Sequence, residues 1–393
     1  RQVRAGVMQK ISPIKGAKAE VIEFNPGFTP DNKYVEILNI VKEVKDVVDI
    51  PVIAANLIRS PKQAELQLEE GIQDFISLGR PLIADPHWVN KTQSGNETLI
   101  KRCVCCLYCF ESMMENAYKY SHGHCSVNPF VGRESTYLKK NGNGRKVLVI
   151  GAGPAGLSAA ELLAKREFDV TVIEKEDCAG GQLNLAKKPP HKEKMGWVCT
   201  DLLNNVKELG VQVEFGVKAT KDIVDTYKPD IVVNATGGNA VFPKPFEREN
   251  VTTVTEILNG NITPENKKVA VIGSGMTGLE TSELLAEQGN EVTIVEMADK
   301  IAPGAWFQHV DDAMPKLESA GTVFMPGHKL LSINDSSIAL ERISDKKTVT
   351  VDADYVVLSL GVRSDTSLYD EIKNSDNYKA YNCLLYTSPS PRD

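Results

Sequence analysis

The stretch KVLVIGAGPAGLSAAELLAKREFDVTVIEK (146–175) aligns without gaps on KVAVIGSGMTGLETSELLAEQGNEVTIVEM (268–297), and fifteen of the thirty positions are identical. Each copy has an apolar run, a GxGxxG motif, an amphipathic stretch and a second apolar run that ends in an acid. This order is typical of a strand, a tight turn, a helix and a second strand in a dinucleotide-binding α/β fold. The chain therefore carries an internal repeat of one nucleotide-binding unit.

The three glycines of each motif have separate roles. The first allows the tight turn, the second lets the backbone approach a pyrophosphate, and the third lets helix and strand pack closely. The helix N-terminus attracts the phosphate charge. The acid at the end of the second strand accepts hydrogen bonds from ribose hydroxyls and repels a 2′-phosphate. These roles are predicted for Gly151, Gly153, Gly156 and Glu174 in the first unit, and for Gly273, Gly275, Gly278 and Glu296 in the second.

A single GxGxxG motif also arises from glycines in an ordinary structural turn. Two copies in the same strand–helix context favour nucleotide binding instead. The residues after the second acid bear on which nucleotide binds. No arginine directly follows Glu296, which favours NADH over NADPH, although Lys300 is close enough in sequence to oppose that preference.

Five of the eight cysteines lie between Cys103 and Cys125. Cys103, Cys106 and Cys109 have C-x2-C-x2-C spacing, and Cys125 follows after fifteen further residues. Thiolates at this spacing can wrap one face of a [4Fe–4S] cubane, which a remote fourth cysteine closes. A zinc site would also accept four thiolates, usually as two separated C-x2-C pairs, and a redox disulfide would need only one pair. We predict the cluster, with Cys105 as the spare thiol.

Residues 34–80 alternate between helical and strand patterns. We expect a helix over Val35–Val48, a short buried strand over Ile50–Leu57, a helix over Ser60–Gly71 with Ser60 as its N-cap, and a strand over Asp74–Arg80. Continuous apolar strands between amphipathic helices predict a parallel sheet. The polar segment KKNGNGR (139–145) then predicts a linker between domains.

At 393 residues the chain is long enough for two or three domains, and its composition is ordinary for a soluble protein: 42% hydrophobic, 25% charged and a net charge of −7. It predicts no membrane helix, no membrane partner and no nucleic-acid partner. Clustered rather than scattered cysteines predict a reducing, cytoplasmic location. The sequence does not begin with Met, and CLLYTSPSPRD (383–393) looks like a translated sequencing adapter. We therefore expect a fragment.

The tandem units resemble the two-dinucleotide flavoproteins, in which the first unit holds FAD and an inserted second unit holds NAD(P)H. GGQLN (180–184) follows the first unit where such flavoproteins approach FAD, and IVVNATGG (231–238) looks like their strand-ending ATG motif. DYVVLSLGVR (354–363) looks like the strand that returns to the FAD unit. The resemblance adds four residues to the FAD site: Gly181, Gln182, Thr236 and Gly237.

The order of motifs along the whole chain is similar to that of the iron–sulfur branch of the old yellow enzyme family. ANLIRSP (55–61), SLGRPLIADP (77–86), the cysteines with CSVNP (125–129) and the tandem units follow one another as in 2,4-dienoyl-CoA reductase, trimethylamine dehydrogenase and the clostridial enoate and bile-acid enone reductases. The resemblance implies an α/β fold: the C-terminal part of a (β/α)8 FMN barrel, a [4Fe–4S] segment and a two-dinucleotide-binding Rossmann-like module. It implies that backbone around Ala55 and Asn56, with Gly79 and Arg80, holds the FMN phosphate.

The resemblance also implies domain bounds. These are the barrel end (1–100), the iron–sulfur segment and linker (101–143), the FAD domain (144–245), the inserted NADH domain (246–360), the return to the FAD domain (361–382) and the adapter-like tail (383–393). The acid that protonates the substrate is expected in barrel strands outside this sequence, so no catalytic residue is named.

The implied function is that of an NADH-dependent oxidoreductase. Electrons would pass from NADH to FAD, to the [4Fe–4S] cluster and to FMN, because NADH delivers a pair whereas a cluster passes one electron at a time. The acceptor would be a small molecule with an activated C=C bond, of the 2,4-dienoyl-CoA, enoate or enone type. Two alternatives stay open: a trimethylamine-dehydrogenase-like enzyme that passes electrons from an oxidised substrate to a carrier protein, and a non-catalytic NADH-oxidising electron-transfer subunit.

Overall fold

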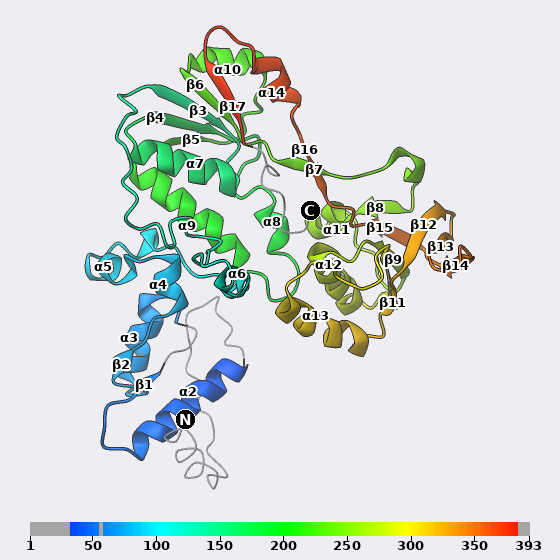
Figure 1. Ribbon diagram of the computed structural model, residues 1–393, viewed down its shortest axis with the longest axis horizontal. Coiled ribbons are helices and arrows are strands. Elements are labelled where there is room, and N and C mark those ends of the chain that lie inside the picture. Colours follow the sequence, from blue (N-terminus) through cyan, green and yellow to red (C-terminus); the bar gives the residue numbers. More distant parts are fainter. Residues whose placement is uncertain (1–31, 55–57, 384–393) are drawn as a thin grey trace. The chain divides into compact units, whose positions relative to one another are not determined.

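The computed structural model describes residues 32–54 and 58–383 (Figure 1). They fall into two compact units, one ending at Thr136 and the other beginning at Tyr137. Two residues predicted to bind FMN phosphate, Ala55 and Asn56, lie outside the described residues. No helix within the described ranges is long and apolar enough to cross a membrane.

The first unit is mainly helical and contains a two-stranded sheet. Its elements are α2 (Asn32–Asp46), β1 (Ile53–Ala54), α3 (Pro61–Glu69), β2 (Phe75–Ile76), α4 (Arg80–Ala84), α5 (Trp88–Gln93), a 3-10 turn (Glu97–Leu99) and α6 (Tyr108–Ala117). The predicted helix–strand alternation and the parallel pairing of the two strands are confirmed, with Ile53 opposite Phe75. The predicted N-cap is also confirmed, because the Ser60 hydroxyl accepts a hydrogen bond from the Gln63 N–H at 3.2 Å.

Strand β2 is shorter than the sequence predicts, and β1 begins at Ile53 rather than at Ile50. Arg80 does not end a strand but begins helix α4, with Gly79 at the N-cap. The physical reason is Pro81, because a proline in the first turn of a helix has a fixed φ that suits the helix and lacks an N–H that would have no partner there. Ile58, Ala64, Trp88 and Ile100 form the small core of this unit.

The second unit opens with a five-stranded parallel sheet of order β17-β6-β3-β4-β5. Its strands are β3 (Lys146–Ile150), β4 (Asp169–Ile173), β5 (Gln212–Glu214), β6 (Ile231–Asn234) and β17 (Lys379–Asn382). The helices of this part are α7 (Pro154–Lys165), α8 (Leu183–Ala186), α9 (Met195–Glu208), α10 (Lys221–Tyr227) and α14 (Ser367–Ile372). In Figure 1, α7 and α9 cover one face of the sheet and α10 and α14 the other.

A second five-stranded parallel sheet, of order β11-β10-β9-β15-β8, is inserted between β6 and β17. Its strands are β8 (Val251–Thr253), β9 (Lys268–Ile272), β10 (Glu291–Val295), β11 (Val323–Met325) and β15 (Tyr355–Leu358). Helices α11 (Val254–Asn259), α12 (Met276–Glu287) and α13 (Phe307–Ser319) pack on one face. An antiparallel sheet of β12 (His328–Ile333), β13 (Ser337–Arg342) and β14 (Thr348–Asp352) packs on the other.

The repeat in the sequence is a repeat in the fold. In each copy a five-residue strand leads to a twelve-residue helix and a second five-residue strand: β3, α7 and β4 in one, β9, α12 and β10 in the other. After an exposed charged first residue, the strands are mostly apolar and buried because both sheet faces are covered. Val147 and Val149 face α7 and α9, whereas Leu148 and Ile150 face α10 and α14.

Two short strands connect the two parallel sheets. The chain leaves the first sheet through β7 (Gly238–Ala240) and returns through β16 (Val362–Ser364), and these strands pair antiparallel. The predicted return strand thus has two parts, because β15 belongs to the inserted sheet and β16 makes the crossing back.

Candidate functional site

The three glycines of the first unit occupy different environments. Gly151 has φ +106°, and a Cβ added there would lie 2.4 Å from the Ala235 carbonyl oxygen. A Cβ on Gly156 would lie 1.9 Å from the Gly151 oxygen. A Cβ on Gly153 would meet only the Cα of Gly181, at 4.0 Å. The first and third glycines are therefore required by the fold, and the second leaves space open in front of the helix.

The second unit repeats this division. Gly273 has φ +103° with the Ser359 oxygen 2.4 Å from an added Cβ, and a Cβ on Gly278 would lie 2.2 Å from the Gly273 oxygen. Nothing lies within 4 Å of a Cβ on Gly275. An open second glycine at a helix N-terminus is the arrangement that admits a pyrophosphate against the backbone.

The acids that end the second strands lie beside these turns. One oxygen of Glu174 accepts the Ala152 N–H at 2.7 Å, and the other accepts the Glu176 N–H at 3.1 Å. Glu296 is held in the same way, by the Ser274 N–H at 2.9 Å and the Ala298 N–H at 2.8 Å. Both oxygens of Glu174, and the Glu296 oxygen that accepts from Ala298, keep lone-pair capacity for a further donor, which a ribose hydroxyl can supply.

The other residues predicted for FAD lie at the same edge of the first sheet. Gly181 is against Gly153, and the Gln182 side-chain amide donates to the Gly238 oxygen at 2.9 Å, directly after the ATG motif. The Thr236 hydroxyl donates to the Asp365 oxygen at 3.2 Å, and the Asp365 N–H donates to the Gly237 oxygen. The structure thus brings the predicted FAD residues of four separate segments together.

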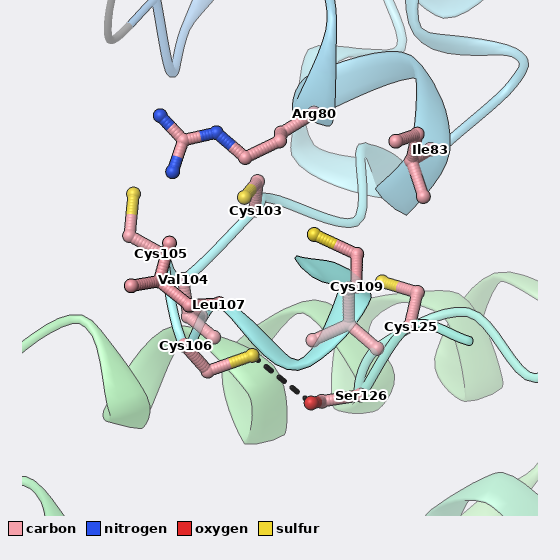
Figure 2. Close-up of a pocket in the computed structure, with 11 residues that line it drawn as sticks. Arg80, Ile83, Cys103, Val104, Cys105, Cys106, Leu107, Cys109, Cys125 and Ser126 are labelled. Atoms are coloured by element: carbon pink, nitrogen blue, oxygen red, sulfur yellow. Dashed lines mark hydrogen bonds between the residues drawn. The ribbon is translucent and has the colours of Figure 1, made fainter. Parts of the chain in front are cut away.

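The clustered cysteines line one pocket in the first unit (Figure 2). Its lining consists of Arg80, Ile83, Cys103, Val104, Cys105, Cys106, Leu107, Cys109, Cys125, Ser126 and Val127. All four predicted cluster ligands and the spare Cys105 therefore surround the same space. No group of three or more His, Cys, Asp or Glu side chains among residues 32–54 and 58–383 is placed to hold a metal ion. The [4Fe–4S] cluster stays a prediction.

Backbone N–H groups donate to three of the four predicted ligand sulfurs, and the fourth lies beside a hydroxyl. Cys103 accepts the Cys105 N–H, Cys109 accepts the Phe110 N–H, and Cys125 accepts the N–H groups of Val127 and Asn128. The sulfur of Cys106 and the hydroxyl of Ser126 are 3.0 Å apart, as Figure 2 shows. Donors to sulfur stabilise thiolates, so these surroundings would suit thiolate ligands, although the described side chains are not themselves arranged around a metal ion.

Two arginines add positive charge to this pocket. Arg59 is buried and contacts the Cys105 sulfur, and Arg80 lines the pocket. The Cys105 hydrogen bond, together with these two guanidinium groups, lowers the pKa of Cys103 to about 6. The same hydrogen bond raises the pKa of Cys105, and burial raises the pKa of Cys109 and of Cys125.

We expect one thiol of the Cys103–Cys105 pair to alkylate fastest in protein stripped of metal. With a pKa of about 6, Cys103 is roughly 90% thiolate at pH 7, whereas Cys199, whose pKa burial raises to about 11, is roughly 0.01% thiolate. Since only the thiolate reacts, the rate should fall as pH drops through about 6. Iodoacetamide labelling read by peptide mass spectrometry measures this profile. A midpoint near the ordinary cysteine pKa of about 8.5 would contradict it.

Three side chains of this site carry no assigned role in the sequence patterns: Arg59, Ser126 and Asn128. Arg59 and Ser126 lie within quoted motifs, but only the structure shows that they meet the cysteines. Asn128 donates to the Ile83 oxygen at 2.8 Å and so ties the CSVNP turn to helix α4. The polar residues within ANLIRSP and CSVNP were the sequence feature that could have indicated these contacts. His122 and His124, just before Cys125 in the sequence, pack against each other and do not line the pocket.

Comparisons with known proteins match both parts of the chain. The pyridine nucleotide-disulphide oxidoreductase family matches residues 145–379, and the NADH:flavin oxidoreductase / NADH oxidase family matches residues 8–98. The chain belongs to the old yellow enzyme/enoate reductase family. Both matches support binding of flavin and NADH by this family member.

Three curated relatives illustrate the family. NADH oxidase from Thermoanaerobacter brockii is 40% identical over 66% of this chain and 41% of its own length. Bilirubin reductase from Mediterraneibacter gnavus is 34% identical over 82% of this chain and 50% of its own length. Cinnamate reductase from Clostridium sporogenes is 31% identical over 84% of this chain and 49% of its own length. This family member thus spans about half the length of the curated relatives it matches.

One solved structure extends the likeness to the fold. The complex of 2-naphthoyl-CoA reductase with 2-naphthoyl-CoA has a TM-score of 0.81 and 29% identity, covering 88% of this chain and 52% of that chain. The family therefore includes reductases that act on C=C substrates, cinnamate reductase among them.

Proposed function

We propose that this chain is part of an NADH-dependent flavin and iron–sulfur oxidoreductase that reduces an activated C=C bond in a small-molecule substrate. The observation that carries the proposal is the second nucleotide unit. Its open Gly275 and the two backbone hydrogen bonds to Glu296 keep the features needed to bind NADH. The relatives named as reductases support the type of acceptor.

The residues of the chain would divide the binding work. Gly153 and Glu174 would receive the pyrophosphate and ribose of FAD, and Gly275 and Glu296 those of NADH. Cys103, Cys106, Cys109 and Cys125 would hold the cluster, and Asn56, Gly79 and Arg80 would contact the FMN phosphate. When bound, the two flavins and the cluster would supply the electron-transfer chemistry, which no side chain of the chain can perform.

The position of Arg80 adds one detail to this division. Its guanidinium lies at the cysteine pocket rather than apart from it. An arginine there would favour negative charge on the thiolates as well as on a phosphate. We therefore propose that Arg80 serves both groups.

An anaerobic titration of the holoenzyme tests the function. NADH is expected to bleach the flavin absorbance, and subsequent addition of cinnamate or 2-naphthoyl-CoA as a probe is expected to restore it. Bleaching by an alkylamine but not by NADH would overturn the proposal in favour of a dehydrogenase that passes electrons outward. Bleaching by NADH with no reoxidation by any activated alkene would favour an electron-transfer subunit.

A further inference from the structure

The two acids of the repeat differ in one hydrogen bond. One oxygen of Glu296 accepts two donors from the same residue, the Ser274 N–H at 2.9 Å and the Ser274 hydroxyl at 2.7 Å. The first unit has Ala152 at that position, which offers Glu174 its backbone N–H at 2.7 Å but no hydroxyl. Ser274 is fully buried, with 0% of its surface exposed, so this hydroxyl has no access to solvent.

The Ser274 hydroxyl also holds the loop that follows the acid. Its oxygen accepts the Ala302 N–H at 2.9 Å. Ala302 is buried and has φ +51°, a left-handed conformation that non-glycine residues adopt only when their surroundings hold them there. Because the oxygen accepts from Ala302, the single hydroxyl hydrogen is available for Glu296. One side chain therefore joins the acid to the end of the loop that carries Lys300.

We propose that Ser274 is a positioning residue that sets the preference of the second unit for NADH over NADPH. It fixes the Glu296 carboxylate where a ribose hydroxyl can reach the remaining lone pairs, and it fixes the 297–302 loop. A fixed carboxylate repels a 2′-phosphate, whereas a mobile loop would let Lys300 turn toward that phosphate. This inference rests on the proposed function, because it assumes that the second unit binds a nicotinamide nucleotide.

The central experiment compares Ser274→Ala with the unaltered holoenzyme in anaerobic stopped-flow reduction of the flavin. We expect the Kd for NADH to rise about tenfold, as for loss of one hydrogen bond to a charged group, while the Kd for NADPH changes much less. The reduction rate at saturating NADH and the FAD content should stay unchanged, because the reacting groups are not touched.

Two further variants separate positioning from general loss of packing. Ser282→Ala is the matched control, since Ser282 is also fully buried and its hydroxyl donates to the Gly278 oxygen at 2.8 Å without contacting the acid. Ser274→Thr keeps a hydroxyl and is expected to restore the preference for NADH. An equal loss of NADH affinity in Ser282→Ala, or an unchanged ratio of the two affinities in Ser274→Ala, would overturn the proposal.

Hydrogen exchange gives a readout that needs no nucleotide. The Ala302 amide is expected to exchange faster in Ser274→Ala than in Ser282→Ala, because its acceptor is removed. Unchanged exchange at Ala302 overturns the inference about Ser274 whatever nucleotide binds. A different result is faster exchange at Ala302 in the variant together with no reaction of the unaltered holoenzyme with NADH or NADPH. That result would contradict the proposed function and, with it, the role of Ser274 in nucleotide choice.

Discussion

Serine at Cys103, Cys106, Cys109 or Cys125 is expected to remove iron and sulfide from the holoenzyme, whereas Cys105→Ser should leave both in place. A cubane needs one thiolate for each of its four irons, and a hydroxyl is a poor substitute for a soft thiolate ligand. We therefore expect iron to fall from about four per chain to less than about one in each of the four variants. Metal and acid-labile sulfide analysis measures this.

The spare cysteine makes this experiment discriminating. Cys105 lines the same pocket and contacts the buried Arg59, so Cys105→Ser controls for any disturbance of the segment. FAD content reports on the second unit and should stay constant in all five variants. Loss of iron from Cys105→Ser together with retention in one of the other four would show that the ligand set is wrong. About one zinc and no sulfide per chain would show that the site binds zinc.

The second large effect concerns the glycines of the second nucleotide unit. Gly275→Ala is expected to leave the fold intact and to weaken NADH binding. Gly275 has φ −57°, which alanine adopts readily, and nothing lies within 4 Å of its added Cβ. The methyl group would instead occupy the space a pyrophosphate needs. An overlap of one methyl group costs about 1–3 kcal/mol, or about 5- to 150-fold in Kd.

Gly278→Ala is the matched variant, with the opposite expectation. Its Cβ would lie 2.2 Å from the Gly273 backbone oxygen, which cannot move without opening the turn between β9 and α12. We expect a loss of about 2–4 kcal/mol in unfolding free energy, larger than the gain of about 1 kcal/mol from alanine in a helix. Thermal unfolding and NADH titration of both variants measure the contrast. Similar destabilisation by the two substitutions would contradict the separate roles.

The nucleotide units could be predicted closely from sequence because their determinants are local. A first glycine with positive φ, a third glycine without room for a Cβ and an acid at the next strand end fix strand, turn and helix within thirty residues. The first unit shows the limit of this reasoning. Strand β2 is only two residues long, and helix α4, with Pro81 in its first turn, begins where the apolar pattern suggested that the strand continues.

Contacts between segments far apart in sequence could not be predicted. The antiparallel sheet β12–β14 carries no recognisable sequence motif. It covers the apolar face of the inserted sheet. Arg59 reaches Cys105 across 46 positions and Ser126 reaches Cys106 across 20, so no spacing rule links them. The role of the Ser274 hydroxyl could not be predicted either, because the GxGxxG motif accepts serine and alanine equally at this position.

The β7–β16 pair has a consequence for the order in which the chain folds. Strand β17 completes the first sheet beside β6, and the bond between Asn234 and Asn382 spans 148 positions. Closing so long a loop is slow when the intervening chain is unfolded. Once the inserted sheet has formed, β16 lies against β7, and only the short segment after Ser364 remains to be placed. We therefore expect pulsed hydrogen exchange during refolding to show amides of β9 and β10 protected before those of β17. The reverse order would mean that the first sheet assembles without help from the insertion.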